Sequence, residues 1–291
     1  MQIVFHIGAH ATDQGKLLKS LFRSKSILAG RGVAVTGPGR YRGLLQETLA
    51  RLDDAQPAPD ARDVLLDAIL DEDTPDRVIL SNDSFICFPG QILAEQMFYA
   101  ATTEKIMKLV NLFPDDQLEF FLALRNPAGF IPAAHELVPR LSFEQFLRGT
   151  NPLHLRWSHM VRRIREAAPQ ATVTVWCNED TPLIWERLLH ALAATDPATE
   201  LNGIHDLLEE IMTREGMQLM RGFIQKNPPR SQARKQRIIE AFLDKFARQD
   251  ILEEELDAPG WTEQLVSQLT DIYEADVEDI RQMQGVRFIA P

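Results

Sequence analysis

The sequence predicts an α/β fold, a doubly wound parallel sheet of about five strands with a helical C-terminal cap. Short apolar runs recur through the first 180 residues, and amphipathic helical patterns lie between them. After residue 180 the strand patterns nearly disappear. Alternation of strands and helices favours a sheet with helices on both faces, and the later residues are expected to add helices.

The expected strands are almost continuously apolar rather than alternating. Such runs are typical of parallel strands that helices cover on both faces. They lie at residues 2–7, 32–36, 77–81, 118–124 and 172–177.

The expected helices follow these strands. Residues 15–29 carry a stripe of apolar side chains at helical spacing, and residues 89–113 and 154–168 are similarly amphipathic. The Asp- and Pro-rich stretch at residues 53–63 predicts an exposed loop. No long flexible linker precedes the helical tail, so we expect one domain, with a core at about residues 1–195 and a cap at about 196–291.

Composition excludes several classes of protein. The chain has 291 residues and a net charge of -11, which argues against general nucleic-acid binding. The first residues lack the pattern of a secretory signal, and no window approaches the roughly 18 apolar residues of a membrane span, so we expect a cytoplasmic protein without a membrane partner. Cys87 and Cys177 are expected to be reduced core residues, and the histidines show no metal-ligand spacing.

The first strand leads into a loop that is typical of anion binding. In "IVFHIGAHATDQGKLLKSLF", residues 3–22, an apolar run ends at Gly8 and a helical pattern begins after Gly15 and Lys16. The glycines are seven positions apart and Leu17 follows the lysine, which departs from the spacing of common ATP- and GTP-binding loops. A helix N-terminus there still offers amide groups to an anion, so Gln14, Gly15 and Lys16 are candidate binding residues.

This loop resembles the first loop of the bacterial sulfotransferase-like family, whose pattern is close to HIGxHKTGTTxIQ. The matching residues are His6, Ile7, Gly8, His10 and Thr12. The resemblance implies a P-loop-like sulfotransferase fold in which the loop holds the 5'-phosphosulfate of 3'-phosphoadenosine-5'-phosphosulfate (PAPS). Ala11 stands in place of the family's lysine, and Asp13, Gln14 and Gly15 replace Gly-Thr-Thr. Asp13 would place a negative charge beside the anion, and Lys16 either compensates or is a solvated surface residue.

A second element is similar to the family's 3'-phosphate site. The strand "LEFFLAL" ends in Arg125, and Pro127 follows at the family's spacing, while Ala133 replaces the family's serine. The resemblance implies that Arg125 binds the 3'-phosphate, because a guanidinium is a strong phosphate ligand. The alternative is a local structural role at the edge of the sheet.

Two acidic turns also match the family in order. "VILSND" would place Asp83 near the family's acidic general base, with His10 as another candidate base. Local turn formation is the alternative for Asp83. Residues 178–180, Asn-Glu-Asp, resemble a later family turn, although Asp180 or Thr181 before Pro182 also predicts a helix start.

Two basic segments complete the candidates. "GPGRYRG", residues 37–43, predicts a turn that brings Arg40 to the ligand-binding edge of the sheet. Residues 226–237 hold five basic residues and predict either a lid over a phosphate or a solvated helix start.

The expected function is sulfuryl transfer from PAPS to an unidentified hydroxyl acceptor, without a metal. The alternative is a catalytically inactive family member that binds a phosphorylated ligand or a protein partner, because Ala11, Asp13 and Ala133 each remove a contact. A nucleotide kinase with a rearranged loop is a third, weaker alternative. The sequence sets neither the acceptor nor the oligomeric state.

Overall fold

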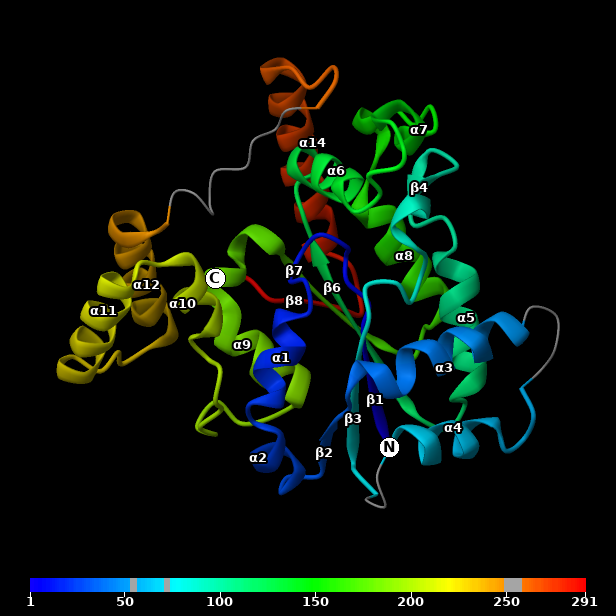
Figure 1. Cartoon of the computed structure of the whole chain (residues 1–291), viewed down its shortest axis with the longest axis horizontal. Coiled ribbons are helices and arrows are strands. Elements are labelled where there is room, and N and C mark those ends of the chain that lie inside the picture. Colours follow the sequence, from blue (N-terminus) through cyan, green and yellow to red (C-terminus); the bar gives the residue numbers. More distant parts are fainter. Residues whose placement is uncertain (53–56, 71–73, 249–257) are drawn as a thin grey trace.

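The computed structural model describes residues 1–52, 57–70, 74–248 and 258–291 (Figure 1). Within them the main sheet has six strands, all parallel, in the order β2-β3-β1-β6-β7-β8. The strands are β1 (Gln2–His6), β2 (Val33–Val35), β3 (Arg77–Ser81), β6 (Gln117–Leu124), β7 (Thr172–Cys177) and β8 (Val286–Phe288).

Helices cover both faces of this sheet (Figure 1). The described α-helices are α1 (Lys16–Phe22), α2 (Lys25–Ala29), α3 (Pro38–Arg51), α4 (Ala61–Ile69), α5 (Thr102–Leu112), α6 (Pro127–Glu136), α7 (Phe143–Leu147), α8 (Trp157–Ala167), α9 (Thr181–Ala193), α10 (Asp206–Ile211), α11 (Arg214–Lys226), α12 (Gln232–Phe246) and α14 (Glu263–Arg281). Short 3₁₀ turns lie at Pro89–Gln91, Pro152–His154 and Asn178–Asp180.

Two apolar cores lie on opposite faces of the sheet. Ile3 and Phe5 of β1 pack with side chains of α3, α4, α5, α8 and α14. Val4 points to the other face and packs with α1, α2 and α9. This alternation within one strand explains why the strand sequences are apolar throughout. The predicted parallel sheet with helices on both faces is therefore confirmed.

Strand β8 is the main difference from the expected fold. The five expected strands are present, and β8 adds a sixth by pairing Val286 and Phe288 with Val173 and Val175 of β7. Its segment has only three residues, with Arg287 at the centre, so it carries no distinctive strand pattern. Helices were expected over residues 181–284, and β8 lies just after them, so the expected sheet of about five strands lacked this sixth strand.

The helix expected at residues 89–113 was also wrong over its first half. Pro89–Gln91 forms a 3₁₀ turn, and β4 (Leu93–Ala94) pairs with β5 (Met97–Phe98) in an antiparallel hairpin before α5 begins. Glu95 and Gln96 take positive φ at the hairpin turn. Their left-handed conformation interrupts any helix, although the apolar spacing suggested one.

Two further expectations need smaller corrections. The helix expected at residues 15–29 is broken at Ser24, whose hydroxyl donates to the carbonyl of Asn202 and accepts from its amide. The loop expected at residues 53–63 lies partly outside the described residues, and α4 already begins at Ala61.

The tail packs on both sides of the core. Helix α12 contacts α9, while α14 contacts α6 and α8 and leads into β8. In Figure 1, α10 to α12 lie beyond α9 as seen from the sheet. One carboxylate oxygen of Asp276 on α14 accepts the amides of Trp157 and Ser158, which caps the start of α8.

The order of the strands creates a switch point between β1 and β6. The chain leaves β1 towards α1 on one face and leaves β6 towards α6 on the other. Open parallel sheets bind ligands where neighbouring strands diverge in this way. The carboxyl ends of β1 and β6 are therefore the place to examine for a site.

Candidate functional site

A cavity of about 450 Å³ lies at this switch point. We call it the switch-point cavity. It is lined by Thr12, Asp13 and Lys16 after β1, Arg125, Asn126, Ala128 and Gly129 after β6, Asn178, Glu179, Thr181, Pro182 and Trp185 after β7, and Leu207, Val266 and Thr270 from the tail. The fold thus brings together Thr12, Lys16 and Arg125, three residues that the sequence marked for binding.

Gly8 supports the loop without lining the cavity. It has a φ of 105°, and a Cβ there would lie 3.1 Å from the amide nitrogen of His10 and 3.3 Å from Cα of Asp83. A side chain would therefore crowd His10 and the turn after β3, at a positive φ that side chains other than glycine rarely adopt. Gln14 and Gly15 also have positive φ and are absent from the cavity wall.

The carboxylate of Asp13 occupies the start of α1. Its Oδ2 accepts the amide of Leu17 at 3.0 Å, and its backbone oxygen accepts the amide of Lys16 at 2.9 Å. These are the amides that a helix N-terminus would offer to a bound anion. The protein therefore supplies its own anion at this helix end.

The ammonium of Lys16 is paired with the helical tail. Its Nζ lies 2.7 Å from a carboxylate oxygen of Glu210 on α10, and the two side chains are 29% and 46% exposed. The lysine thus lines the cavity while balancing a charge of the protein itself.

Arg125 is almost buried, with 9% exposure, at the end of a central strand. Its guanidinium donates to the carbonyl of Ala11, which connects it to the first loop. Its own carbonyl accepts the indole N–H of Trp157 at 2.9 Å. Both sides of the switch point are thereby joined through this residue.

Glu179 lines the cavity, although the resemblance to the sulfotransferase-like family did not mark it as a binding residue. Its Oε1 accepts the amide of Asn126 at 2.7 Å, and its Oε2 accepts the hydroxyl of Tyr273 at 3.0 Å. Helix α9 does start at Thr181 as expected, although Asp180 makes no side-chain capping bond. Burial, followed by the charge of Glu179, raises the pKa of Asp180.

Thr181 contributes its side-chain hydroxyl to the cavity wall. Its Oγ1 is buried and has no hydrogen-bond partner among the described residues. A buried hydroxyl normally has a partner, so this position favours a ligand that carries a hydrogen-bonding group.

The candidate bases His10 and Asp83 lie together, outside the cavity wall. His10 is 1% exposed, its Nδ1 lies 2.9 Å from the hydroxyl of Tyr99, and its Nε2 lies 3.3 Å from the hydroxyl of Ser84. The Ser84 hydroxyl in turn donates to Asp83. Burial lowers the pKa of His10, with Asp83 opposing the shift, so a neutral imidazole is favoured.

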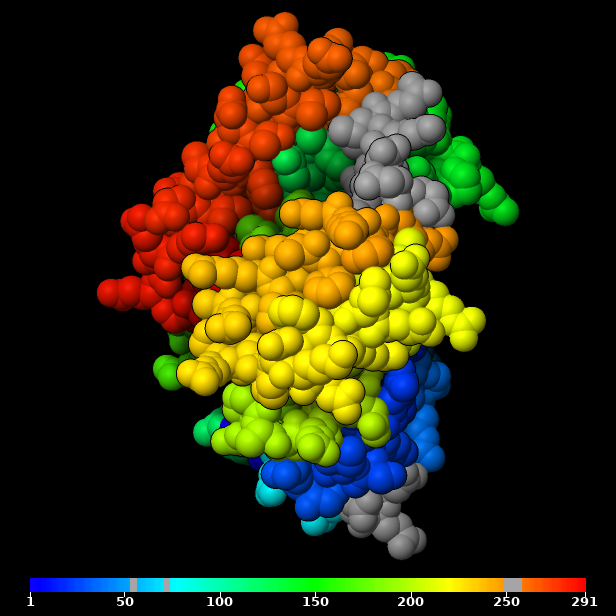
Figure 2. All heavy atoms as spheres, turned by 90° about the vertical axis from the view of Figure 1, so that its left-hand side faces the viewer, coloured from blue at the N-terminus to red at the C-terminus, as the bar shows by residue number. Residues whose placement is uncertain are grey.

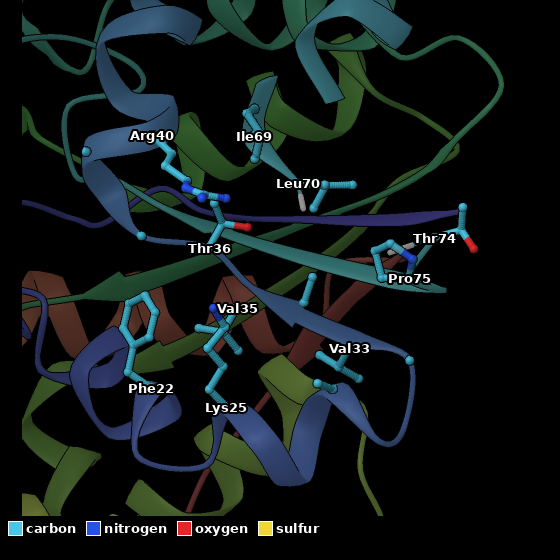
Figure 3. Close-up of a pocket in the computed structure, with 15 residues that line it drawn as sticks. Phe22, Lys25, Val33, Val35, Thr36, Arg40, Ile69, Leu70, Thr74 and Pro75 are labelled. Atoms are coloured by element: carbon cyan, nitrogen blue, oxygen red, sulfur yellow. The ribbon is translucent and has the colours of Figure 1, made fainter. Parts of the chain in front are cut away.

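Arg40 lies in a different cavity. The expected turn at residues 37–43 is instead the start of α3, because Gly37 precedes the helix and Pro38 fits its first turn. Arg40 lines a space of about 820 Å³ along the edge strand β2, with Phe22 and Lys25 on the opposite side (Figure 3). The structure does not bring Arg40 to the switch-point cavity.

The basic run at residues 226–237 also lies elsewhere. Helix α12 begins at Gln232, and the hydroxyl of Ser231 accepts the amide of Arg234 at 3.2 Å. The expected helix start is thus present. Arg230 and Lys235 line a third cavity rather than covering the first loop.

Cys87 and Cys177 are free and buried, and burial raises their pKa values to about 12 and about 11. Among the described residues, no group of three or more His, Cys, Asp or Glu side chains is arranged to hold a metal ion. None of the helices in the described ranges is long and apolar enough to cross a membrane.

Comparisons with protein-family models, curated proteins and solved structures gave no match.

Proposed function

We propose that this chain is a catalytically inactive, sulfotransferase-like protein that binds a phosphorylated small molecule in the switch-point cavity. The observation that carries the proposal is the carboxylate of Asp13, which accepts the amide of Leu17 at the start of α1. By resemblance, this helix end is where the phosphosulfate of PAPS would sit. A carboxylate there repels the sulfuryl group and takes the donor that would bind it.

The remaining chemistry also favours binding over transfer. The family's lysine is Ala11 here, so the loop lacks the charge that would stabilise the leaving phosphate. His10 and Asp83 are absent from the cavity wall, and His10 is buried against Tyr99. A general base must come within hydrogen-bond distance of the acceptor, directly or through a water molecule.

The element that resembles the family's 3'-phosphate site keeps more of the family's pattern than the first loop does. Arg125 lines the cavity, and its planar guanidinium fits a phosphate with two parallel hydrogen bonds. Lys16 adds a second cation and Thr181 a buried hydroxyl. These groups support a ligand with one phosphate near Arg125 and a further polar group near Thr181.

Calorimetry with 3'-phosphoadenosine-5'-phosphate (PAP) tests this proposal. We expect Arg125→Ala to weaken PAP binding by about 1.5 to 3 kcal/mol, roughly ten- to a hundredfold. Arg125→Lys keeps the charge without the fork and should recover part of the loss. Arg162→Ala is the matched control, since Arg162 is an exposed arginine on α8, away from the cavity wall.

Two outcomes would contradict the proposal. Unchanged PAP affinity in a well-folded Arg125→Ala protein removes Arg125 from the site, as does an effect confined to the melting temperature. Turnover of PAPS by the unmodified protein at about 1 per second or faster shows an active enzyme. The triple variant Ala11→Lys, Asp13→Gly, Ala133→Ser should gain sulfuryl transfer only if the starting protein is inactive.

A further inference from the structure

The third cavity, which Arg230 and Lys235 line, carries a surplus of positive charge. It encloses about 730 Å³ between α9, the turn after α9, the start of α12 and the sheet. We call it the basic cavity. Its lining residues are Arg77, Glu119, Glu186, Arg187, His190, Ala191, Ala194, Thr195, Pro197, Pro229, Arg230, Ser231, Gln232, Lys235 and Arg287. Figure 2 views the molecule from the side on which α11 and α12 lie in front.

Cations outnumber carboxylates on this wall, which holds five Lys or Arg residues and two Glu residues. Both carboxylates are already paired within the protein. Arg77 binds both oxygens of Glu119, at 2.9 and 2.7 Å, and Lys235 pairs with Glu186. Three arginines, Arg187, Arg230 and Arg287, therefore have no carboxylate partner among the described residues. This surplus stands out in a chain whose net charge is -11.

Arg187 shows the consequence of this surplus. Its guanidinium donates to the carbonyl of Ala290, a neutral group. Burial, followed by the positive charge of Arg287, lowers the pKa of Arg187. Two like charges are thus held near each other, and a bound anion would remove the repulsion.

One further feature favours an anion, and two nearby negative groups are already engaged within the protein. Ser231 and Gln232 bring the N-terminus of α12, a helix of 15 residues, to the cavity wall, where its partial positive charge adds to that of the arginines. The C-terminus of α9 carries the opposite partial charge, but Arg77 donates to the carbonyl of Leu192 there at 2.8 Å. Asp196, in the same turn, accepts the amide of Ala198 at 2.7 Å.

We propose that the basic cavity is a binding site for a small molecule with two or more phosphate groups, held by Arg187, Arg230 and Arg287. Guanidinium groups suit phosphate oxygens because they offer paired donors in one plane. The volume lies within the range of small-molecule sites, about 300 to 1,000 Å³. The two cavities share no lining residue, so this site is separate from the proposed PAP site.

Calorimetry at low ionic strength with inorganic pyrophosphate and inorganic phosphate tests the site. We expect pyrophosphate to bind at least about tenfold more tightly than phosphate, because it engages more than one arginine. Arg230→Gln and Arg287→Gln should each weaken pyrophosphate binding about tenfold or more. Both side chains are exposed, so the variants are expected to fold normally, which melting temperatures check.

Two controls separate this site from other causes. Arg162→Gln removes the same charge from an exposed position on α8 and should leave pyrophosphate binding unchanged. Pyrophosphate binding is also measured in Arg125→Ala, in which the switch-point cavity has lost its arginine and the binding that remains belongs to the basic cavity. The proposal is overturned if the unmodified protein does not bind pyrophosphate, if folded Arg230→Gln and Arg287→Gln proteins bind it normally, or if Arg162→Gln weakens it equally.

Discussion

The two ends of α9 border two cavities that differ in how their charged side chains are paired. Near its start, the switch-point cavity contains Lys16 and Arg125 beside Asp13 and Glu179, and each of these groups has a partner within the protein. Near its end, the basic cavity keeps three arginines without a carboxylate partner among the described residues. The motif that resembles an anion site thus lies in the balanced cavity, while the positive surplus lies in the other.

This contrast shows that the charges of a site must be counted after internal pairs are removed. A phosphate entering the switch-point cavity must compete with Asp13 for the start of α1. A phosphate entering the basic cavity instead relieves the repulsion between Arg187 and Arg287. Substitutions that remove one charge from either cavity therefore test this balance.

The largest effect is expected at Arg77, the cation of the basic cavity that serves the fold. Its side chain is 3% exposed and binds Glu119, Gln2 and the carbonyl of Leu192. Arg77→Met leaves the carboxylate and the carbonyl without their donor, and we expect unfolding in urea to show a loss of about 3 to 5 kcal/mol.

The double variant Arg77→Met, Glu119→Leu is the control for that measurement. Removing both charges should recover much of the lost stability, because no uncompensated carboxylate remains. Arg287→Gln, by contrast, should change stability by less than about 0.5 kcal/mol. A loss below about 1 kcal/mol in Arg77→Met would show that Arg77, like Arg287, contributes little to the stability of the fold.

Asp13 provides the next largest effect, in the switch-point cavity. Asp13→Ala removes the carboxylate that accepts the amide of Leu17, and we expect a loss of about 1 kcal/mol in stability. PAP affinity should rise about fivefold, because a like charge leaves and an amide becomes available. Asp13→Asn keeps an acceptor and should retain most of the stability. Weaker PAP binding in Asp13→Ala would contradict the view that this carboxylate competes with a ligand.

A smaller effect is expected at Glu210, the partner of Lys16. The pair is partly exposed, so Glu210→Gln should cost only about 0.2 to 1 kcal/mol in stability. PAP binding should strengthen, since Lys16 no longer balances a carboxylate. Glu47→Gln is the matched control, because it breaks the exposed pair between Glu47 and Arg51 on α3. Equal PAP affinity in the two variants would exclude Lys16 from ligand binding.

The smallest effect concerns pH at His190 in the basic cavity. Burial lowers its pKa below the ordinary value of 6.5 for histidine, Lys235 acts in the same direction, and Glu186 and Asp196 oppose the shift. The unfolded chain therefore takes up the proton more readily, so His190 contributes stability above pH 6.5 that is lost as the pH falls through that value towards the lower folded pKa.

Thermal unfolding at several pH values measures this contribution. His190→Gln should reduce the loss of stability below pH 6.5, whereas His159→Gln, at an exposed histidine on α8, should not. Pyrophosphate should also reduce the loss, because a bound anion favours the charged imidazole. An unchanged pH profile in His190→Gln would show that the histidine titrates equally in both states.

The first loop shows which site residues could be predicted from the sequence. Apolar runs located β1 and β6, and the carboxyl ends of neighbouring parallel strands meet at one edge of the sheet. Thr12, Lys16 and Arg125 could therefore be expected in one cavity. The sequence could not show that Arg40 lies outside this cavity, because a Gly- and Pro-rich segment fits a turn as well as the start of α3.

Local pattern thus determined the parallel sheet and the position of its loops, because burial on both faces requires apolar runs and helices between them. Tertiary structure decided the pairing of charges and of the last strand. Lys16 meets Glu210 across 194 positions of sequence, Tyr273 donates to Glu179, and β8, which follows α14 and contacts it, pairs with β7. These choices depend on which surfaces meet after folding, and no spacing along the chain encodes the charge that remains in a cavity once its neighbours are paired.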